Sequence, residues 1–127
     1  MIVMSVIEKY PIVVVIEGLG KAEGELVRTY APLTISSIVK SLPLRSRAYK
    51  LPDRVYLSIG LAMDVEKPRQ QASRGDIAFW PQASAITFFI KDVKLTQAVS
   101  LIGKITSGIE LIERAPMGTP MLIQLAK

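Results

Sequence analysis

The chain has 127 residues, half of them apolar, with 16 Lys and Arg against 11 Asp and Glu and neither cysteine nor histidine. The missing residue types exclude disulfides, thiolate nucleophiles, histidine-based triads and Cys/His zinc sites, so we expect no cofactor and no metal. The net charge of +5 favours anionic partners, and the length predicts one domain over residues 1–127 with a single core.

The segment from Met1 to Ile16 is largely apolar but is interrupted by Glu8, Lys9 and Pro11. A membrane-spanning helix needs about 20 apolar residues without such breaks. A signal peptide would show basic residues ahead of an apolar core and small residues at a cleavage point, and the segment shows neither. We therefore expect a cytoplasmic protein with no membrane partner, present as a monomer or a homodimer.

Two strands are predicted near the start of the chain. Ile12 to Ile16 is a continuous β-branched run, too short for a helix of its own and typical of a strand buried on both faces. The turn residues Gly18 to Lys21 follow. Glu23 to Tyr30 then returns as the second strand of an antiparallel hairpin.

The clearest helix is predicted at about residues 32–42. Pro32 is tolerated in the first turn of a helix, and Pro43 ends it. Between them the period of the sequence is that of a helix. The apolar residues on its one face are Ala31, Ile35, Ile38, Val39 and Leu42.

A basic segment covers residues 40–54. It contains a single carboxylate, Asp53, and Tyr49 and Tyr56 lie within it or directly after it. Cations combined with aromatic rings bind single-stranded nucleic acid through phosphate contacts and stacking. A solvated loop rim is the simpler interpretation and is preferred, with nucleic acid as an alternative partner. The candidate anion-binding residues are Lys40, Arg45, Arg47, Lys50 and Arg54.

The second half of the chain is predicted to be mainly strands. The polar stretch 66–73, which includes Pro68, is predicted to be a loop, and 95–101 a short helical turn. Short strands, one clear helix and regular turn signals together predict a mainly β protein whose antiparallel barrel closes on itself. Strands are predicted over residues 54–61, 83–90, 101–105 and 121–125.

Several motifs along the chain form a recognisable set. One is Gly75-Asp76-Ile77-Ala78-Phe79-Trp80-Pro81, with Phe88-Phe89 after it; others are Gly20 to Leu26, Ala31 to Thr34 and Ile102 to Ile105. This set resembles a family of small prokaryotic cyclophilin-like proteins of uncharacterised function, over most of the chain. The resemblance implies a closed cyclophilin-like β-barrel with one or two short helices besides that at 32–42.

The resemblance to true cyclophilins is partial. Those enzymes pair a Phe-His-Arg segment with a tryptophan loop, and the corresponding parts of the chain contain neither. Phe89 matches one of their cleft residues, and Thr87 stands where they have glutamine. The small family has glycine where this chain has Ala83 and Ile90, and glycine permits loop geometries that other residues do not.

The resemblance predicts a ligand cleft beside the strand that contains Phe89. The first hypothesis is that the cleft binds a small molecule or a proline-containing peptide without catalysis. The alternative is weak peptidyl-prolyl isomerase activity, in which Phe89 forms the pocket wall and Arg69 or Arg74 donates to weaken amide resonance. The predicted cleft residues are Phe79, Trp80, Thr87, Phe89, Arg69 and Arg74.

Overall fold

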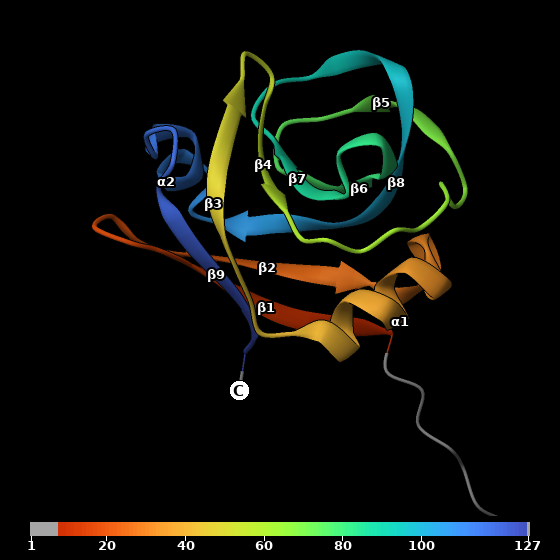
Figure 1. Ribbon diagram of the computed structural model, residues 1–127, viewed down its shortest axis with the longest axis horizontal. Coiled ribbons are helices and arrows are strands. Elements are labelled where there is room, and N and C mark those ends of the chain that lie inside the picture. The colour runs from red at the N-terminus through yellow and green to blue at the C-terminus, as the bar shows by residue number, and fades with distance from the viewer. Residues whose placement is uncertain (1–7, 127) are drawn as a thin grey trace, which may run out of the picture.

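The computed structural model describes residues 8–126, whose strands form one sheet that closes on itself (Figure 1). Spatial neighbours follow the order β2, β1, β9, β3, β4, β7, β6, β8, and β2 also pairs with β8. These eight strands form a closed antiparallel barrel, and β5 is an extra strand paired with β8. The predicted mainly β barrel is confirmed. The elements are β1 (Lys9–Ile16), β2 (Gly20–Val27), the 3-10 helix η1 (Arg28–Tyr30), α1 (Pro32–Ser41), β3 (Leu44–Leu51), β4 (Arg54–Ser58), β5 (Arg69–Ala72), β6 (Asp76–Trp80), the 3-10 helix η2 (Pro81–Ala83), β7 (Ala85–Phe89), β8 (Val93–Ser107), α2 (Ile109–Arg114) and β9 (Pro120–Leu125).

The predicted helix at 32–42 is α1, and it buries Thr34, Ile35 and Ile38. One of the short helices that the resemblance implies is α2, which buries Ile112. The two helices lie on opposite sides of the barrel (Figure 1). Both helices therefore contribute apolar side chains to the core that the strands enclose.

The predicted strands 23–30 and 54–61 end earlier in the structure, at Val27 and Ser58, and residues 28–30 form η1. Three other segments differ in the type of structure that was predicted. The basic segment, for which a loop rim was preferred, contains the strand β3. The predicted loop 66–73 contains β5, and the predicted helical turn 95–101 lies inside the single long strand β8. In each segment the backbone pairs with a strand distant in sequence, and local residue patterns carry little information on such pairing.

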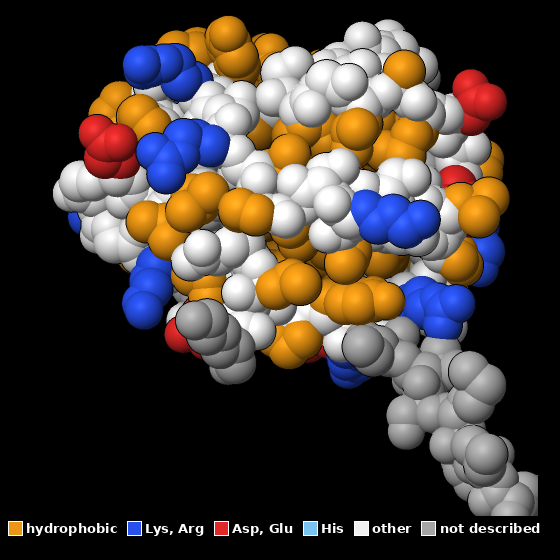
Figure 2. All heavy atoms as spheres, turned by 60° about the horizontal axis from the view of Figure 1, so that its bottom comes forward, with side chains coloured by type: hydrophobic (Ala, Val, Ile, Leu, Met, Phe, Trp, Pro, Cys, Tyr) orange, Lys and Arg blue, Asp and Glu red, His pale blue; other side chains and the backbone are white. Residues whose placement is uncertain are grey.

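Strand β1 is buried on one face only, which corrects the expectation of burial on both. Ile12, Val14 and Ile16 point into the barrel, whereas Val13 and Val15 point outward and are half-buried. Figure 2 views the molecule from the lower side of Figure 1, and there apolar side chains gather over the middle, with Lys and Arg around them.

The apolar side chains form two clusters separated by the sheet. The larger cluster fills the barrel and includes Phe79 and Phe88. The smaller one lies where β5 and the first half of β8 cover the outer face of β6 and β7. Its buried members are Ala72, Ala78, Phe89, Leu95 and Val99.

Closure of the barrel depends on close backbone contact between β2 and β8. Gly24 pairs with Ile105, and Leu26 pairs with Gly103. A Cβ on Gly24 would lie 2.7 Å from the carbonyl oxygen of Lys104, and one on Gly103 would overlap that of Glu25. Only glycine allows the two strands to approach in this way.

The start of α1 is capped by a distant carboxylate, that of Glu66. The residue before the helix, Ala31, offers no capping side chain. Oε1 of Glu66 accepts hydrogen bonds from Thr34 N (2.8 Å) and Thr34 Oγ1 (2.7 Å), and Oε2 accepts one from Leu33 N (3.1 Å). The amide of Glu66 donates to Ser100 Oγ at 2.7 Å. Glu66 therefore fixes the irregular segment 59–68 to both α1 and β8.

Replacing Gly103 by alanine is expected to destabilise the fold by about 2–3 kcal/mol, because the added methyl group forces β2 and β8 apart. Gly60→Ala is the matched control. Gly60 has a φ of +73° and nothing within 4 Å of the added Cβ, so it incurs only backbone strain of about 1–2 kcal/mol. Urea unfolding, followed by Trp80 fluorescence, measures the loss of stability in both variants. Equal losses would contradict the close contact between β2 and β8 at Gly103.

Glu66→Ala is expected to lower the free energy of unfolding by about 1 kcal/mol at pH 7, the usual cost of a lost helix cap. Burial acts to raise the pKa of the Glu66 carboxyl, but hydrogen bonds from Thr34 and Leu33 outweigh it, so the pKa lies below its ordinary value of 4.5. A lowered folded-state pKa stabilises the fold above the unfolded-state pKa, and this stabilisation disappears as the pH falls through the folded-state value.

The free energies of unfolding of the wild type and of Glu66→Ala, measured with urea at several pH values, should therefore become more similar below about pH 4.5. Glu17→Ala, which removes an exposed carboxylate at the end of β1, should leave unfolding near the wild type at every pH. A difference that stays constant down to pH 2.5 would contradict the capping role of the ionised carboxylate.

Candidate functional site

The residues of the predicted cleft do not line one open surface. Phe79 lies in the barrel core, and Phe89 lies in the outer cluster beneath β5 and β8. Thr87 is fully buried, and its hydroxyl has no hydrogen-bond partner within residues 8–126. Trp80 is half-buried and packs at the border of the outer cluster. The outer face of β7, where a cleft was predicted, is covered by the β5–β8 pair.

An arginine, Arg54, lies against Phe89 and Trp80. Its Cζ is 4.7 Å from the Trp80 ring centroid and 5.1 Å from that of Phe89, within cation–π range. Asp53 accepts from Nε and Nη2 of Arg54 at 2.7 and 3.1 Å. These hydrogen bonds from Arg54 hold the pKa of the Asp53 carboxyl below its usual value, although burial opposes the shift. The Arg54 side chain is only 12% exposed, so it is fixed between the two rings.

Three aromatic rings continue outward from Arg54. Tyr56 stands edge-on to Trp80 at 5.2 Å between centroids, and it stacks on Tyr49 at 5.5 Å with an interplanar angle of 22°. The Trp80 indole N–H donates to Gln97 Oε1 at 2.9 Å. The structure thus joins Trp80 and Phe89 of the predicted cleft to Tyr49, Arg54 and Tyr56, which sequence analysis had placed in or beside the basic segment.

The two arginines assigned to the cleft lie elsewhere. Nη1 of Arg74 donates to Glu113 Oε1 at 2.7 Å and to the carbonyl oxygen of Ile90 at 2.8 Å, so Arg74 ties the start of β6 to α2 and to the end of β7. Arg69 begins β5 and lines an open hollow of about 410 Å³. The arginine beside Phe89 is therefore Arg54 rather than Arg69 or Arg74.

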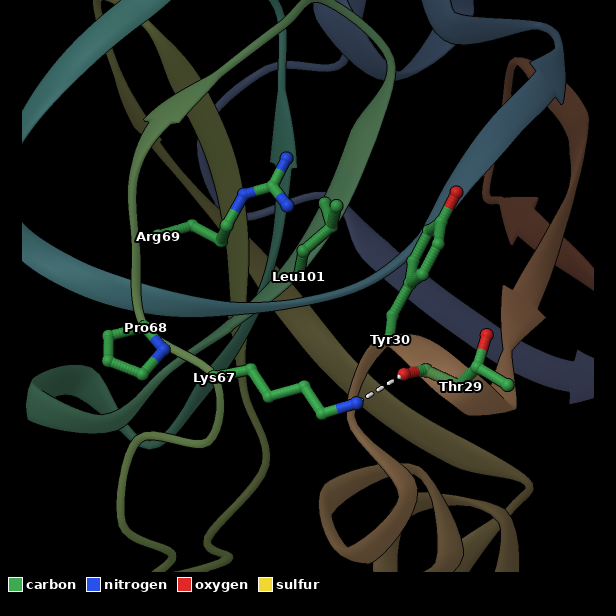
Figure 3. Close-up of a pocket in the computed structure, with 6 residues that line it drawn as sticks. All are labelled: Thr29, Tyr30, Lys67, Pro68, Arg69 and Leu101. Atoms are coloured by element: carbon green, nitrogen blue, oxygen red, sulfur yellow. Dashed lines mark hydrogen bonds between the residues drawn. The ribbon is translucent and has the colours of Figure 1, made fainter.

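The hollow around Arg69 is lined by two cationic side chains together with aromatic and apolar ones (Figure 3). Arg69 and Tyr30 stand on opposite sides of it with Leu101 between them, and Lys67 extends below them toward Thr29 (Figure 3). Lys67 Nζ donates to the carbonyl oxygen of Thr29 at 2.8 Å, which leaves two of its three protons for other acceptors. The lining residues are Thr29, Tyr30, Lys67, Pro68, Arg69 and Leu101.

The charge of the hollow is positive and the backbone beneath it is held firmly. Among residues 8–126 neither Lys67 nor Arg69 forms an ion pair, and the neighbouring carboxylate of Glu66 is turned to α1. Lys67 has a φ of +49°, a conformation that non-glycine residues adopt only where their surroundings enforce it. The hydrogen bonds of Glu66 and the ring of Pro68 supply that constraint from either side.

The basic segment is distributed over several elements. Lys40 is exposed at the end of α1, and Lys50 donates from Nζ to the carbonyl oxygen of Glu113 at 2.8 Å. Arg45 and Arg47 point outward from β3, on the same face as Tyr49. The predicted anion-binding residues therefore do not form one patch, but Arg45, Arg47 and Tyr49 form a row.

Sequence analysis missed Lys67, Tyr30 and the contact between Arg54 and Phe89. Lys67 and Tyr30 are 37 positions apart and share no motif. The pairing of Tyr49 with Tyr56 could have been predicted from the sequence. Pro52-Asp53 is a two-residue turn, and the two tyrosines lie at equal distances along the chain from it. The pairing of Arg54 with Phe89 depends on the register of β4 against β7, which no local signal gives.

Within residues 8–126, no three carboxylates gather in a way that could hold a metal ion. Neither helix of that range has the length and apolar character that a membrane crossing requires.

Comparison with known proteins places this chain in a family. The sequence matches the family model described as Cyclophilin-like over residues 10–124. A hypothetical protein from Archaeoglobus fulgidus, with a structure determined in solution, has a TM-score of 0.79 and 24% identity, over 94% of this chain and 96% of its own. The structure of McbB in complex with tryptophan has a TM-score of 0.71 and 11% identity, over 89% of this chain and 44% of McbB. Both structural likenesses concern the fold alone, and curated protein sequences give no match. The match over residues 10–124 shows that the chain belongs to the cyclophilin-like family.

Proposed function

We propose that the protein binds a small organic anion that carries a ring, in the hollow lined by Lys67, Arg69 and Tyr30, without covalent chemistry. The observation that carries this proposal is a pair of cations at the hollow, Lys67 and Arg69, that have no ion-pair partner within residues 8–126 and lie beside an aromatic side chain. A carboxylate or phosphate between Lys67 and Arg69 would receive charge-assisted hydrogen bonds from both. Tyr30, Pro68 and Leu101 offer apolar surface for the ring.

The fixed backbone that carries Lys67 and Arg69 supports the proposal. Glu66 is anchored to α1 and to Ser100, and Lys67 and Pro68 follow it directly. Arg69 begins the β5 strand, where it pairs with Val99 of β8. A ligand therefore meets cations whose backbone is already in place, so less conformational entropy is lost on binding.

The fold of McbB, solved with tryptophan, supports the choice of probes. Tryptophan combines a ring with a carboxylate, and the hollow offers apolar surface for the ring and cations for the carboxylate. Its ammonium group would be repelled by Lys67 and Arg69. Indole-3-acetate keeps the ring and the carboxylate and lacks the ammonium, and tryptamine keeps the ring and the ammonium and lacks the carboxylate.

We expect indole-3-acetate to shift the backbone amide signals of Thr29, Arg69 and Leu101 in an NMR titration of the ¹⁵N-labelled protein. Tryptophan should bind more weakly, and tryptamine should give no shift at the hollow. Arg69→Gln should lower the affinity for indole-3-acetate about tenfold, because one charge-assisted hydrogen bond is lost.

Lys91→Gln is the control, since it removes an exposed cation in the turn after β7 while the hollow keeps its own charges. Its affinity for indole-3-acetate should equal that of the wild type. Equal losses in Arg69→Gln and Lys91→Gln would show that net charge alone attracts the anion. Absence of any shift at the hollow with all three probes would rule out this ligand class.

Peptidyl-prolyl isomerisation is the second candidate, favoured by the contact of Arg54 with the Phe89 ring. An arginine donor beside an apolar ring is the pair that this reaction needs. Against it, Phe89 is completely buried with Leu95 and Val99, and two of the Arg54 nitrogens already donate to Asp53. A proline ring would reach Phe89 only if β5 and the first half of β8 moved away from β7.

We therefore expect no acceleration of cis/trans exchange in a short Ala-Pro peptide, as measured by NMR exchange spectroscopy at catalytic amounts of protein. Accelerated exchange that is lost in Arg54→Ala and kept in Arg69→Ala and Arg74→Ala would establish an isomerase at Phe89. Acceleration that depends on Arg69 or Arg74 instead would place the catalytic site at the polar segment before Gly75.

A further inference from the structure

The outer surface of β3 and β4 presents a stack of aromatic rings that ends in solvent. Tyr49 is 47% exposed, although one of its faces is covered by the Tyr56 ring. The opposite face of Tyr49 is therefore the open end of the stack. Tyr56 rests edge-on against Trp80, and Trp80 is braced by Arg54 and Gln97. The stack is therefore held at its Trp80 end and exposed to solvent at its Tyr49 end.

Cations and apolar surface extend from this open end along β3. Arg47 and Arg45 lie two and four residues before Tyr49 on the same face, so about 7 Å separates each outward side chain from the next. Arg47 uses Nη1 to donate to the carbonyl oxygen of Gly118 at 3.1 Å, and this contact orients its guanidinium. Leu51, on the other side of Tyr49, is 40% exposed. We call Arg45, Arg47, Tyr49, Leu51 and Tyr56 the β3–β4 face.

The charge of the β3–β4 face is not neutralised. Among residues 8–126 neither Arg45 nor Arg47 forms an ion pair. Asp53, the carboxylate in the turn between the two strands, is held by Arg54. Glu17 lines a small hollow together with Arg45 but makes no ion pair with it. The face therefore combines an open aromatic stack with two guanidinium groups in line that have no ion-pair partner among residues 8–126.

We propose that the β3–β4 face binds single-stranded nucleic acid, with one base stacked on Tyr49 and the backbone phosphates following β3 past Arg47 and Arg45. An unpaired base continues the stack because it offers a free π face, whereas the bases of a duplex are already stacked. Leu51 contacts the next base. This site is separate from the hollow of Lys67 and Arg69, and the proposal stands whether or not that hollow binds an organic anion.

The test is fluorescence anisotropy of a fluorescein-labelled deoxythymidine decamer titrated with the full chain. We expect binding in 50 mM salt that is stronger than binding of a ten-base-pair duplex. With two phosphate contacts, the logarithm of the association constant should fall against the logarithm of salt concentration with a slope of about −1.4. Tyr49→Ala should lower the affinity about tenfold, and Tyr49→Phe should retain it, since stacking needs the ring and not the hydroxyl.

Charge variants separate a specific site from general attraction. Arg47→Gln should weaken binding and reduce the salt slope by about 0.7, whereas Arg114→Gln, an equal change of charge on α2, should leave both unchanged. Arg69→Gln should also leave decamer binding unchanged. The proposal for the β3–β4 face can therefore fail independently of the proposal for the hollow of Lys67 and Arg69.

Three results would overturn the proposal. The first is absence of decamer binding at 50 mM salt. The second is binding that Tyr49→Ala does not weaken, which would indicate attraction by net charge only. The third is NMR shifts of Tyr49 and Tyr56 with an Ala-Pro peptide but none with the decamer, which would assign the β3–β4 face to a peptide instead.

Discussion

The structure depends on the single long strand β8 (Val93–Ser107), which pairs with three other strands. Its C-terminal half pairs with β6 and closes the barrel against β2, where Gly24 and Gly103 allow the backbones to meet. Its N-terminal half leaves the barrel wall and pairs with β5. The register of β8 shifts at Ile102, where it pairs with β6, and again between Lys94 and Val99, where it pairs with β5. Such irregularities bend a strand and increase its twist, so one strand can serve both roles. Barrel closure and coverage of the outer face are therefore coupled through β8.

That coupling accounts for the location of both candidate sites. The β5–β8 pair buries Phe89, Thr87 and Ala78 beneath it, so the outer face of β7 is a second core and not a cleft. The segment that leads into β5 must then cross from β4 to β8, and Glu66 fixes its path by capping α1. Where this segment crosses, Lys67 and Arg69 line the open hollow described above. The same coverage stops at Trp80, where the aromatic stack of Tyr56 and Tyr49 begins.

The structure groups the predicted site residues differently from the sequence analysis. Trp80 and Phe89 were placed together, as the structure has them, but their partner is Arg54, because β4 lies beside β7 in a register that pairs Arg54 with Phe89. Arg69 was expected beside Phe89 and instead faces a hollow with Lys67 and Tyr30. Such groupings join strands that are far apart in sequence, and their register follows from packing across the whole barrel rather than from any local pattern.

The sequence by itself determined the elements that local chemistry specifies. The helical period and the two prolines defined α1, the turn residues placed the β1–β2 hairpin, and the motif around Trp80 indicated the cyclophilin-like barrel. Only the tertiary structure decided that β3 and β5 are strands, that β8 runs unbroken, and that Arg54 meets Phe89. Polar segments such as 44–51 and 69–72 have no apolar periodicity of their own. They become strands because a neighbouring strand supplies the backbone hydrogen bonds, and that neighbour is known only once the barrel has closed.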